Sequence, residues 1–286
     1  MTVFDIITDK KPSLSFEVFP PKTSDTYESV AKAATDIAKL SPSFMSVTYG
    51  AAGTTAGFTT QIASELLANG VTPIAHLTCI NATRQKVRSH LEELKARGIK
   101  NILALRGDKP QGAEELCSDY TYASQLAKEI ADFGGFCIGG ACYPECHPES
   151  PNSTVDIENL RKKVDCGCQF LTTQMFFDNN ILYNFMYRLY KAHIDVPIVA
   201  GIMPVTNAAQ IKRIMSISQS ALPQRFVRIV DRYGDDPEAM KQAGIAFATE
   251  QVIDLYANGI NAVHIYSMNK PDVAAAIKNN ISYIIG

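Results

Sequence analysis

Short apolar runs alternate with longer amphipathic segments along almost the whole chain. The apolar runs are typical of buried strands, because they are rich in Val, Ile, Leu and Phe and end at Gly, Pro or polar residues. They lie at residues 14–19, 44–49, 73–80, 101–105, 136–143, 170–175, 196–203 and 263–266. Segments with helical spacing lie at 26–40, 60–68, 83–97, 122–133, 155–166, 180–192, 208–217, 237–258 and 271–279. Gly98 and Gly259 are placed to end two of these helices.

This alternation predicts an α/β fold, a (β/α)8 TIM barrel formed as a single domain by residues 1–286. Residues 219–236 form a longer excursion before the helix at 237–258. The competing architecture is a doubly wound open sheet. Gly134-Gly135 and Gly139-Gly140 lack the third glycine and the helix start of a dinucleotide-binding turn, so the barrel is favoured.

Composition narrows the class of protein. With a formal charge of −2, a pI near 6.2 and no long Lys/Arg run, the chain has no basic footprint for nucleic acid. Residues 1–12 are polar and lack a signal-peptide core, and no segment approaches the roughly 18 apolar residues of a membrane helix. We therefore expect a soluble, cytoplasmic protein without a membrane or nucleic-acid partner. The oligomeric state is not fixed by the sequence, and a homo-oligomer is compatible with it.

The seven cysteines favour reduced thiols over a disulfide framework, because their number is odd and the chain has ordinary domain size. They do not form the paired C-x-x-C spacing of a zinc ribbon, so we expect core packing for most of them and no metal site. Their positions are Cys79, Cys117, Cys137, Cys142, Cys146, Cys166 and Cys168.

Polar residues gather where the predicted strands end, which is where a barrel carries its chemistry. Glu17 lies between Phe16 and Val18 in the first strand, where desolvation would raise its pKa and suit it to general acid catalysis. The alternative is a glutamate paired with a barrel cation. The other polar or functional strand-end residues are Thr48, Tyr49, His76, Thr78, Arg106, Asp108, Tyr143, His147, Gln174, Met203 and Tyr266.

Several motifs, in order along residues 14–270, together resemble the methylenetetrahydrofolate reductase family in its short bacterial form. They are Phe16-Glu-Val-Phe-Pro-Pro21, Ser46-Val-Thr-Tyr-Gly-Ala51, His76-Leu-Thr-Cys79, Ala104-Leu-Arg-Gly-Asp108, Tyr143-Pro-Glu-Cys-His-Pro-Glu149, Lys162-Lys-Val-Asp165, Thr173-Gln-Met-Phe-Phe-Asp178, Gly201-Ile-Met-Pro204 and His264-Ile-Tyr-Ser-Met-Asn269.

The resemblance implies a flavoprotein that binds FAD across the barrel mouth. It would reduce 5,10-methylenetetrahydrofolate to 5-methyltetrahydrofolate in a ping-pong cycle, with NADH or NADPH as the donor. Opening the five-membered ring of the folate needs a proton at N10, and Glu17 matches the family's acid. The iminium at N5 gains from a nearby carboxylate, and Asp108 matches that residue.

By the same match, the resemblance assigns ligand contacts. FAD would be held by Tyr49, Ala51, His76, Arg106, Gly107, Asp108, Tyr122, Ala123, Tyr143, His147, Asp156, Asn159 and Lys163. The cationic groups among them suit its diphosphate and ribose. The folate would contact Thr48, Gln174, Gln210, Tyr266 and Lys270.

The chain departs from the family pattern in three places. Many relatives have Arg-Asp-Arg-Thr where this chain has Ala56-Gly-Phe-Thr59, some place an aromatic residue at Ile214, and Lys270 stands where Arg is usual. These changes leave the identity of the electron donor open. In an alternative function, the chain is a flavin-binding subunit that NADH and NADPH do not reduce directly and that receives electrons from a partner protein. A barrel metallohydrolase using His76, His147 and a carboxylate is a further alternative, although no H-x-H pair stands at a strand end.

Overall fold

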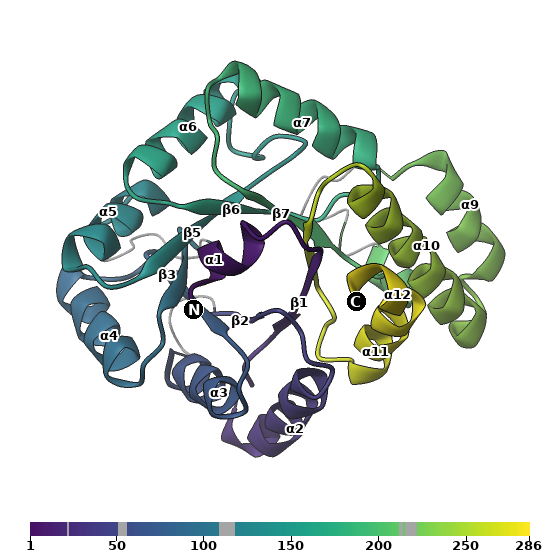
Figure 1. Cartoon of the computed structure of the whole chain (residues 1–286), viewed down its shortest axis with the longest axis horizontal. Helices are drawn as coiled ribbons and strands as arrows, with labels where there is room; N and C mark the ends of the chain where they lie inside the picture. The colour runs from purple at the N-terminus through teal and green to yellow at the C-terminus, as the bar shows by residue number, and fades with distance from the viewer. Residues whose placement is uncertain (22, 51–55, 109–117, 212–213, 215–221) are drawn as a thin grey trace.

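Parallel strands close into a barrel in the computed structural model, which describes the chain except for residues 22, 51–55, 109–117, 212–213 and 215–221 (Figure 1). Each described strand pairs with its neighbours in chain order, and β1 closes the ring by pairing with β8. The predicted (β/α)8 fold is therefore confirmed. The strands are β1 (Ser13–Val18), β2 (Met45–Val47), β3 (Pro73–Thr78), β4 (Asn101–Leu105), β5 (Cys137–Cys142), β6 (Phe170–Thr173), β7 (Ile198–Ile202) and β8 (Ala262–Ile265).

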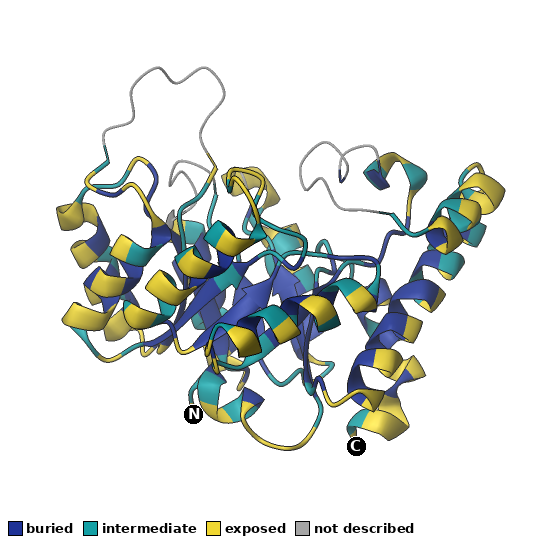
Figure 2. Ribbon diagram, turned by 90° about the horizontal axis from the view of Figure 1, so that it is seen from above, coloured by how far each residue is buried: buried dark blue, intermediate teal, exposed yellow. Residues whose placement is uncertain are grey.

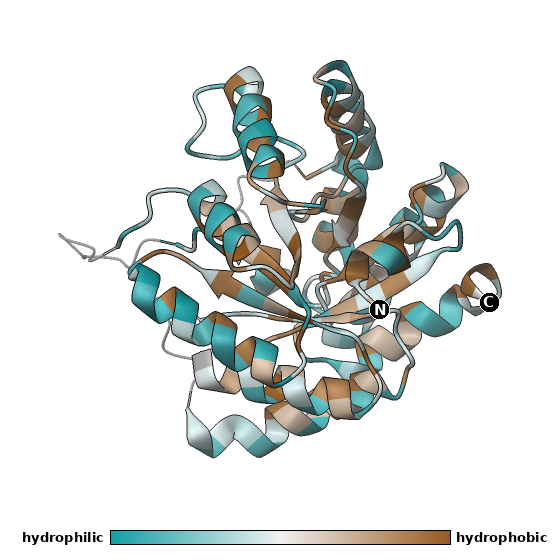
Figure 3. Cartoon of the chain, turned by 60° about the vertical axis from the view of Figure 1, so that its left-hand side comes forward, coloured by the Kyte–Doolittle hydropathy of each residue, from teal (hydrophilic) through white to brown (hydrophobic). Residues whose placement is uncertain are grey.

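Amphipathic helices form the outer ring around these strands. Figure 3 shows hydrophobic positions on their inner faces and hydrophilic ones outside, and Figure 2 shows the same division as burial. The helices are α2 (Tyr27–Ala38), α3 (Ala56–Ala68), α4 (Arg84–Ala96), α5 (Ala123–Phe133), α6 (Ser153–Asp165), α7 (Asn179–Lys191), α10 (Pro237–Ala257) and α11 (Pro271–Asn280). As predicted, Gly98 and Gly259 follow the ends of α4 and α10, with φ of +75° and +81°.

The sequence interpretation missed several shorter elements. Residues 219–236, for which only a longer excursion was predicted, contain α9 (Gln224–Tyr233). Its Phe226 is buried, and Ile229 and Val230 pack partly against the same cluster, which is the i, i+3, i+4 spacing of an amphipathic helix. The helix expected at 208–217 is described only at 208–211 and 214, and the remainder lies outside the described residues. The other short elements are η1 (Ser24–Thr26), α1 (Val3–Ile7) and α12 (Ser282–Ile285).

The α1 helix covers the amino-terminal end of the barrel. Val3 and Ile7 are buried in a cluster with Phe44, Ile74 and other inward residues of the strands. The backbone N–H of Val3 also donates to Oδ1 of Asn101 at 2.8 Å. Figure 1 shows α1 lying across the centre of the ring. This end of the barrel is therefore closed by packing, which leaves the carboxyl end for a ligand.

Alternation along β1 shows how the strands divide their side chains. Leu14, Phe16 and Val18 belong to the core between the barrel and the helices. Ser15 and Glu17, the intervening residues, point to the interior, as period-two geometry requires.

No helix in the described part of the chain is long and apolar enough to span a membrane.

Candidate active site

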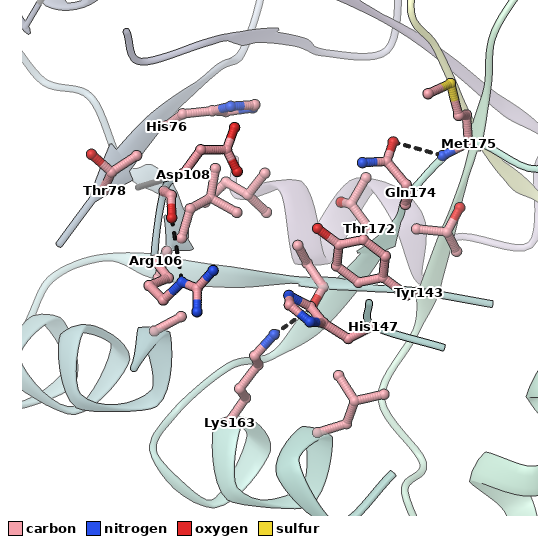
Figure 4. A pocket seen from close by; sticks show the side chains of 18 of the residues that line it. His76, Thr78, Arg106, Asp108, Tyr143, His147, Lys163, Thr172, Gln174 and Met175 are labelled. Carbon is pink, nitrogen blue, oxygen red and sulfur yellow. Dashed lines mark hydrogen bonds between the residues drawn. The ribbon is translucent and has the colours of Figure 1, made fainter. Parts of the chain in front are cut away.

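A cavity of about 1080 Å³ opens at the carboxyl end of the barrel. Glu17 and Asp108 line the same cavity, as the sequence interpretation requires. The other predicted site residues that line it are Tyr49, His76, Arg106, Gly107, Tyr122, Ala123, Tyr143, His147, Asp156, Asn159, Lys163, Gln174, Gln210 and Tyr266. Figure 4 shows side chains of several strands and of α6 converging on it.

Glu17 is held in a form suited to proton donation. Its side chain is buried inside the barrel, and this desolvation raises its pKa from 4.5 to about 8. His76 lies beside it, with Nε2 3.8 Å from Oε2 of Glu17, and burial lowers the pKa of this imidazole to about 3. Both groups are therefore neutral near pH 7, so their contact is not an ion pair. The alternative of a glutamate paired with a barrel cation does not describe this side chain.

Two buried polar atoms in the cavity lack a hydrogen-bond partner among the described residues. They are Nε2 of His76 and Oγ1 of Thr78, both on β3. Buried polar atoms are normally paired, because an unpaired one costs roughly 1–3 kcal/mol. Their position in the cavity wall makes them available to a bound ligand.

The turn after β4 presents charges of opposite sign. Gly107 has φ of +86°, and a Cβ there would lie 2.7 Å from Cγ2 of Ile80, so the turn between Arg106 and Asp108 favours glycine. Arg106 forms a two-point ion pair with Glu149, with Nη2 2.6 Å from Oε1. Asp108, in contrast, is exposed to solvent at the cavity mouth.

A basic side chain from α6 enters the cavity wall beside β5. Lys163 donates from Nζ to the carbonyl oxygen of Ala141 at 2.7 Å, and burial lowers its pKa. His147 accepts at Nδ1 from the backbone N–H of Glu149 at 3.1 Å, so neutral His147 carries its proton on Nε2. Its ring packs edge-on against Tyr143, with centroids 4.6 Å apart.

The loop before α6 is fixed by Asp156, which was predicted to contact FAD. Its carboxylate accepts from the backbone N–H of His147 at 3.1 Å and from Oγ of Ser150 at 3.2 Å. Asn152 caps α6 by accepting from the N–H groups of Thr154 and Val155. Asp156 therefore already orders the cavity wall within the protein.

Several predicted folate contacts use their polar atoms inside the protein. Oε1 of Gln174 accepts from the N–H of Met175 at 2.9 Å, as Figure 4 shows, which leaves the amide NH₂ as its donor. Tyr266 donates its hydroxyl to the carbonyl of Thr173 at 2.5 Å. Oε1 of Gln210 accepts from the N–H of Thr206 at 3.0 Å.

The remaining predicted positions lie elsewhere. Thr48 and Lys270 are described but do not line the cavity. The Thr48 carbonyl accepts from the Thr59 hydroxyl, and Nζ of Lys270 donates to Oγ1 of Thr206 at 2.9 Å, beside the loop of Gln210. Ala51 lies outside the described residues.

Three further residues of the cavity lining differ in their exposure. Tyr122 is 63% exposed at the start of α5. Burial raises the pKa of Tyr49, whose ring packs edge-on against His90. Ile214, one of the departures, is buried and lines the cavity.

Some lining residues were not identified from the sequence as site residues. They include Ser46, Thr172, His264 and Glu149. The first three lie on strands and point inward, so the period-two alternation that singled out Glu17 could also have found them. Nothing in the sequence near Arg106 indicated its pairing with Glu149, because the two residues are distant along the chain.

Among the described residues, no group of three or more His, Cys, Asp or Glu side chains is arranged to hold a metal ion. Cys79, Cys137, Cys142 and Cys168 are buried free thiols, whereas Cys146 and Cys166 are partly exposed. Core packing therefore describes most of the six, as predicted. Cys117 lies outside the described part of the chain.

Several proteins are similar to this chain in sequence. The chain is 36% identical over 269 residues to 5,10-methylenetetrahydrofolate reductase of Escherichia coli, covering 93% of this chain and 89% of that protein. It is 34% identical over 289 residues to methylenetetrahydrofolate reductase (NADH) 1 of Arabidopsis thaliana, covering 95% of this chain but 48% of the plant protein. The chain thus spans about half the length of the plant relative.

A solved structure shares the fold at lower identity. It is an uncharacterized protein from Clostridium thermocellum that binds two copies of 5-methyl-5,6,7,8-tetrahydrofolic acid, with a TM-score of 0.68, 15% identity and 98% of each chain covered. The family model described as methylenetetrahydrofolate reductase matches residues 2–282, nearly the whole chain. Together with the bacterial relatives, this match shows that the chain belongs to the methylenetetrahydrofolate reductase family of enzymes.

Proposed function

We propose that this chain, working as one catalytic domain, reduces 5,10-methylenetetrahydrofolate to 5-methyltetrahydrofolate with FAD bound in the barrel cavity. The observation that carries the proposal is Glu17, a buried carboxyl whose pKa is raised to about 8, in the same cavity as Asp108 and the cations Arg106 and Lys163. The name of the E. coli relative and the folate bound by the Clostridium neighbour support the choice of substrate.

The residues of the cavity fit FAD. Its volume of about 1080 Å³ is at the top of the range of roughly 300–1,000 Å³ for small-molecule sites, so it has room for a large cofactor. The unpaired atoms of His76 and Thr78 offer hydrogen bonds that the protein itself does not use. Arg106, His147 and Lys163 supply the donors that a diphosphate and a ribose require. When bound, FAD would supply the redox-active ring that carries two electrons to the substrate.

Arg106 must reorganise to serve this role. In this structure both terminal nitrogens of its guanidinium face the carboxylate of Glu149. A phosphate would compete with that carboxylate for the same planar donors. We therefore propose that Arg106 either exchanges Glu149 for the diphosphate or is shared between them.

Glu17 would act as the general acid. Because its proton is retained near pH 7, it can deliver that proton to N10 of the folate and open the five-membered ring. The positive charge then formed at N5 would be stabilised by Asp108. Asp108 is exposed in this structure, so its effect depends on bound ligands excluding water from the cavity mouth.

Gln174 and Gln210 would orient the folate. Since Oε1 of each accepts a backbone N–H of its own loop, each presents its NH₂ group as the remaining donor. Such donors suit the ring nitrogens and carbonyl oxygen of a pterin. Lys270 would act from outside the cavity, through the loop of Thr206 and Gln210.

We further propose that NADH or NADPH and the folate use this cavity in turn, which gives ping-pong order. The cytoplasm remains the predicted location.

Anaerobic spectroscopy tests the proposal. The protein is loaded with FAD, and its flavin absorbance is followed after addition of NADH or NADPH and then of 5,10-methylenetetrahydrofolate. Bleaching by a nicotinamide and recovery by the folate, with 5-methyltetrahydrofolate as product, are expected. In a second outcome, dithionite bleaches the flavin but NADH and NADPH do not, and the folate then reoxidises it. That outcome would point instead to a protein electron donor. Failure to bind FAD would refute the proposal.

A further inference from the structure

A polar network lies on the inner wall of the barrel next to Glu17. Its members are Ser15 on β1, Ser46 on β2 and His264 on β8, all buried. Oγ of Ser15 is 2.7 Å from Nδ1 of His264, and Oγ of Ser46 is 2.8 Å from Nε2 of the same ring. The proton transfer proposed above does not use this network.

The direction of these hydrogen bonds follows from the carbonyl of Val263. Oγ of Ser15 lies 2.9 Å from that oxygen, which can only accept, so the single hydroxyl proton of Ser15 is donated there. Nδ1 of His264 must then carry the proton of its bond to Ser15. Burial lowers the pKa of His264 to about 3, so the ring is neutral and Nε2 is an acceptor. Ser46 therefore donates its hydroxyl proton to His264.

The direction of the Ser46–His264 hydrogen bond determines whether Ser46 can donate or accept a hydrogen bond in the cavity. Ser46 is the register partner of Glu17 across β1 and β2, and both residues line the cavity. With its proton used by His264, the Ser46 oxygen has only lone pairs left. The phenol of Tyr266 is committed in the same way, because its proton goes to the carbonyl of Thr173.

We propose that His264 is a positioning residue: held as the Nδ1–H tautomer by Ser15, it accepts the hydrogen bond of the Ser46 hydroxyl at Nε2 and so leaves Glu17 beside a group that accepts hydrogen bonds but cannot donate them. A carboxylate needs donors, whereas a carboxylic acid needs an acceptor. The network therefore favours the protonated form of Glu17 beyond the effect of burial. This inference rests on the proposed function insofar as that proton is the one delivered to the folate.

Other titratable groups lie in the same cavity as Glu17. His76 on β3 lies 3.8 Å away and is neutral, and its pKa is lowered by burial. Tyr266, which follows β8, has a pKa raised well above its ordinary value, mainly by burial and also by Glu17. Further titratable groups of the same cavity are Tyr49, Arg106, Asp108, Tyr122, Tyr143, His147, Glu149, Asp156, Lys162 and Lys163. The variants below leave all of them unchanged, so a comparison between variants isolates the hydroxyl of Ser46.

The test measures the pKa of Glu17 by infrared titration of its protonated carboxyl band in the full-length protein, with Glu17→Gln to assign the band. In His264→Phe a phenyl ring replaces the imidazole and both ring nitrogens are lost, so the Ser46 hydroxyl is free to donate to the carboxylate. The pKa of Glu17 is expected to fall by about one unit or more. In Ser15→Ala the tautomer is no longer fixed, and a smaller fall in the same direction is expected.

Two controls separate hydrogen bonding from packing. In the double variant His264→Phe/Ser46→Ala no hydroxyl is left to donate, so the fall should vanish relative to Ser46→Ala alone. Ser13→Ala, which removes a buried hydroxyl of the same strand that donates to Asn261, should leave the pKa unchanged.

The inference is overturned if His264→Phe leaves the pKa of Glu17 unchanged, or if the fall persists without Ser46. If His264→Phe fails to fold, the comparison of Ser15→Ala with Ser13→Ala is the test, and equal pKa values of Glu17 in these two variants would overturn the inference. The titration needs neither flavin nor folate. A protein that cannot reduce folate would therefore refute the proposed function without altering this result.

Discussion

Glu17→Gln should change how the stability of the protein depends on pH. The carboxyl has a pKa of about 8 in the folded protein and an ordinary value of 4.5 when solvated. Between these values the unfolded chain releases this proton while the folded chain keeps it, so rising pH favours unfolding. Glutamine has no proton to release, so the Glu17→Gln variant does not lose stability in this way as the pH rises.

The structure sets the size of the effect. At about 1.36 kcal/mol per pKa unit, the difference between 4.5 and about 8 corresponds to almost 5 kcal/mol as an upper value. Water drawn into the open cavity on ionisation reduces it, so we expect roughly 2–5 kcal/mol. Relative to wild type, Glu17→Gln should gain this amount of unfolding free energy as the pH is raised from 4.5 to 8 or slightly above.

Urea unfolding of flavin-free protein across this pH range measures the gain, because bound FAD would stabilise both proteins by mass action. Glu92→Gln is the matched control, since Glu92 is exposed on α4 and should give a curve parallel to wild type. If the stabilities of Glu17→Gln and wild type also run parallel from pH 4.5 to 8, Glu17 does not hold its proton in the folded state.

Further variants probe the proposed ligand contacts. Asp108→Asn should slow the folate half-reaction at least 10-fold while FAD retention changes less; equal rates in rapid-mixing experiments would remove its electrostatic role. Arg106→Ala and Lys163→Met should each weaken FAD binding about 10-fold or more in fluorescence titrations, since each removes a charge-assisted donor, and unchanged affinity would exclude that contact. Lys270→Arg should lower the KM for folate modestly, because a planar fork replaces a point charge beside Thr206; a KM within error of wild type would show that this residue does not reach the folate tail.

The fold was predictable because each unit carries a local signal. Apolar strand runs and amphipathic helices recur in order, and a closed parallel barrel is the architecture that buries them all. The missed α9 shows where this reasoning weakens. Its apolar residues Phe226, Ile229 and Val230 form a short stripe among Arg and Asp residues, and a long connection was the simpler interpretation. The short α1 was missed because its burial depends on the barrel base, which is a tertiary property.

The sequence predicted which residues line the candidate site better than it predicted the hydrogen bonds and ion pairs between them. Alternation and motif resemblance identified Glu17 and Asp108, and the structure brings both to one cavity. They could not reveal that Arg106 pairs with Glu149 or that Tyr266 donates to Thr173, because these partners are set by the closure of the barrel. His264 belonged to a recognised motif, yet its hydrogen bonds depend on residues more than two hundred positions away.

Glu17 is proposed to supply the proton for folate reduction within a cavity that holds FAD. The most direct measurement is the anaerobic reoxidation of the reduced, FAD-loaded protein by 5,10-methylenetetrahydrofolate, in wild type and in Glu17→Gln. Both proteins are expected to bind FAD and to accept electrons on it, and reoxidation of the variant is expected to be slower by a factor of roughly 10²–10⁴. Reoxidation of Glu17→Gln at close to the wild-type rate would show that Glu17 is not the acid.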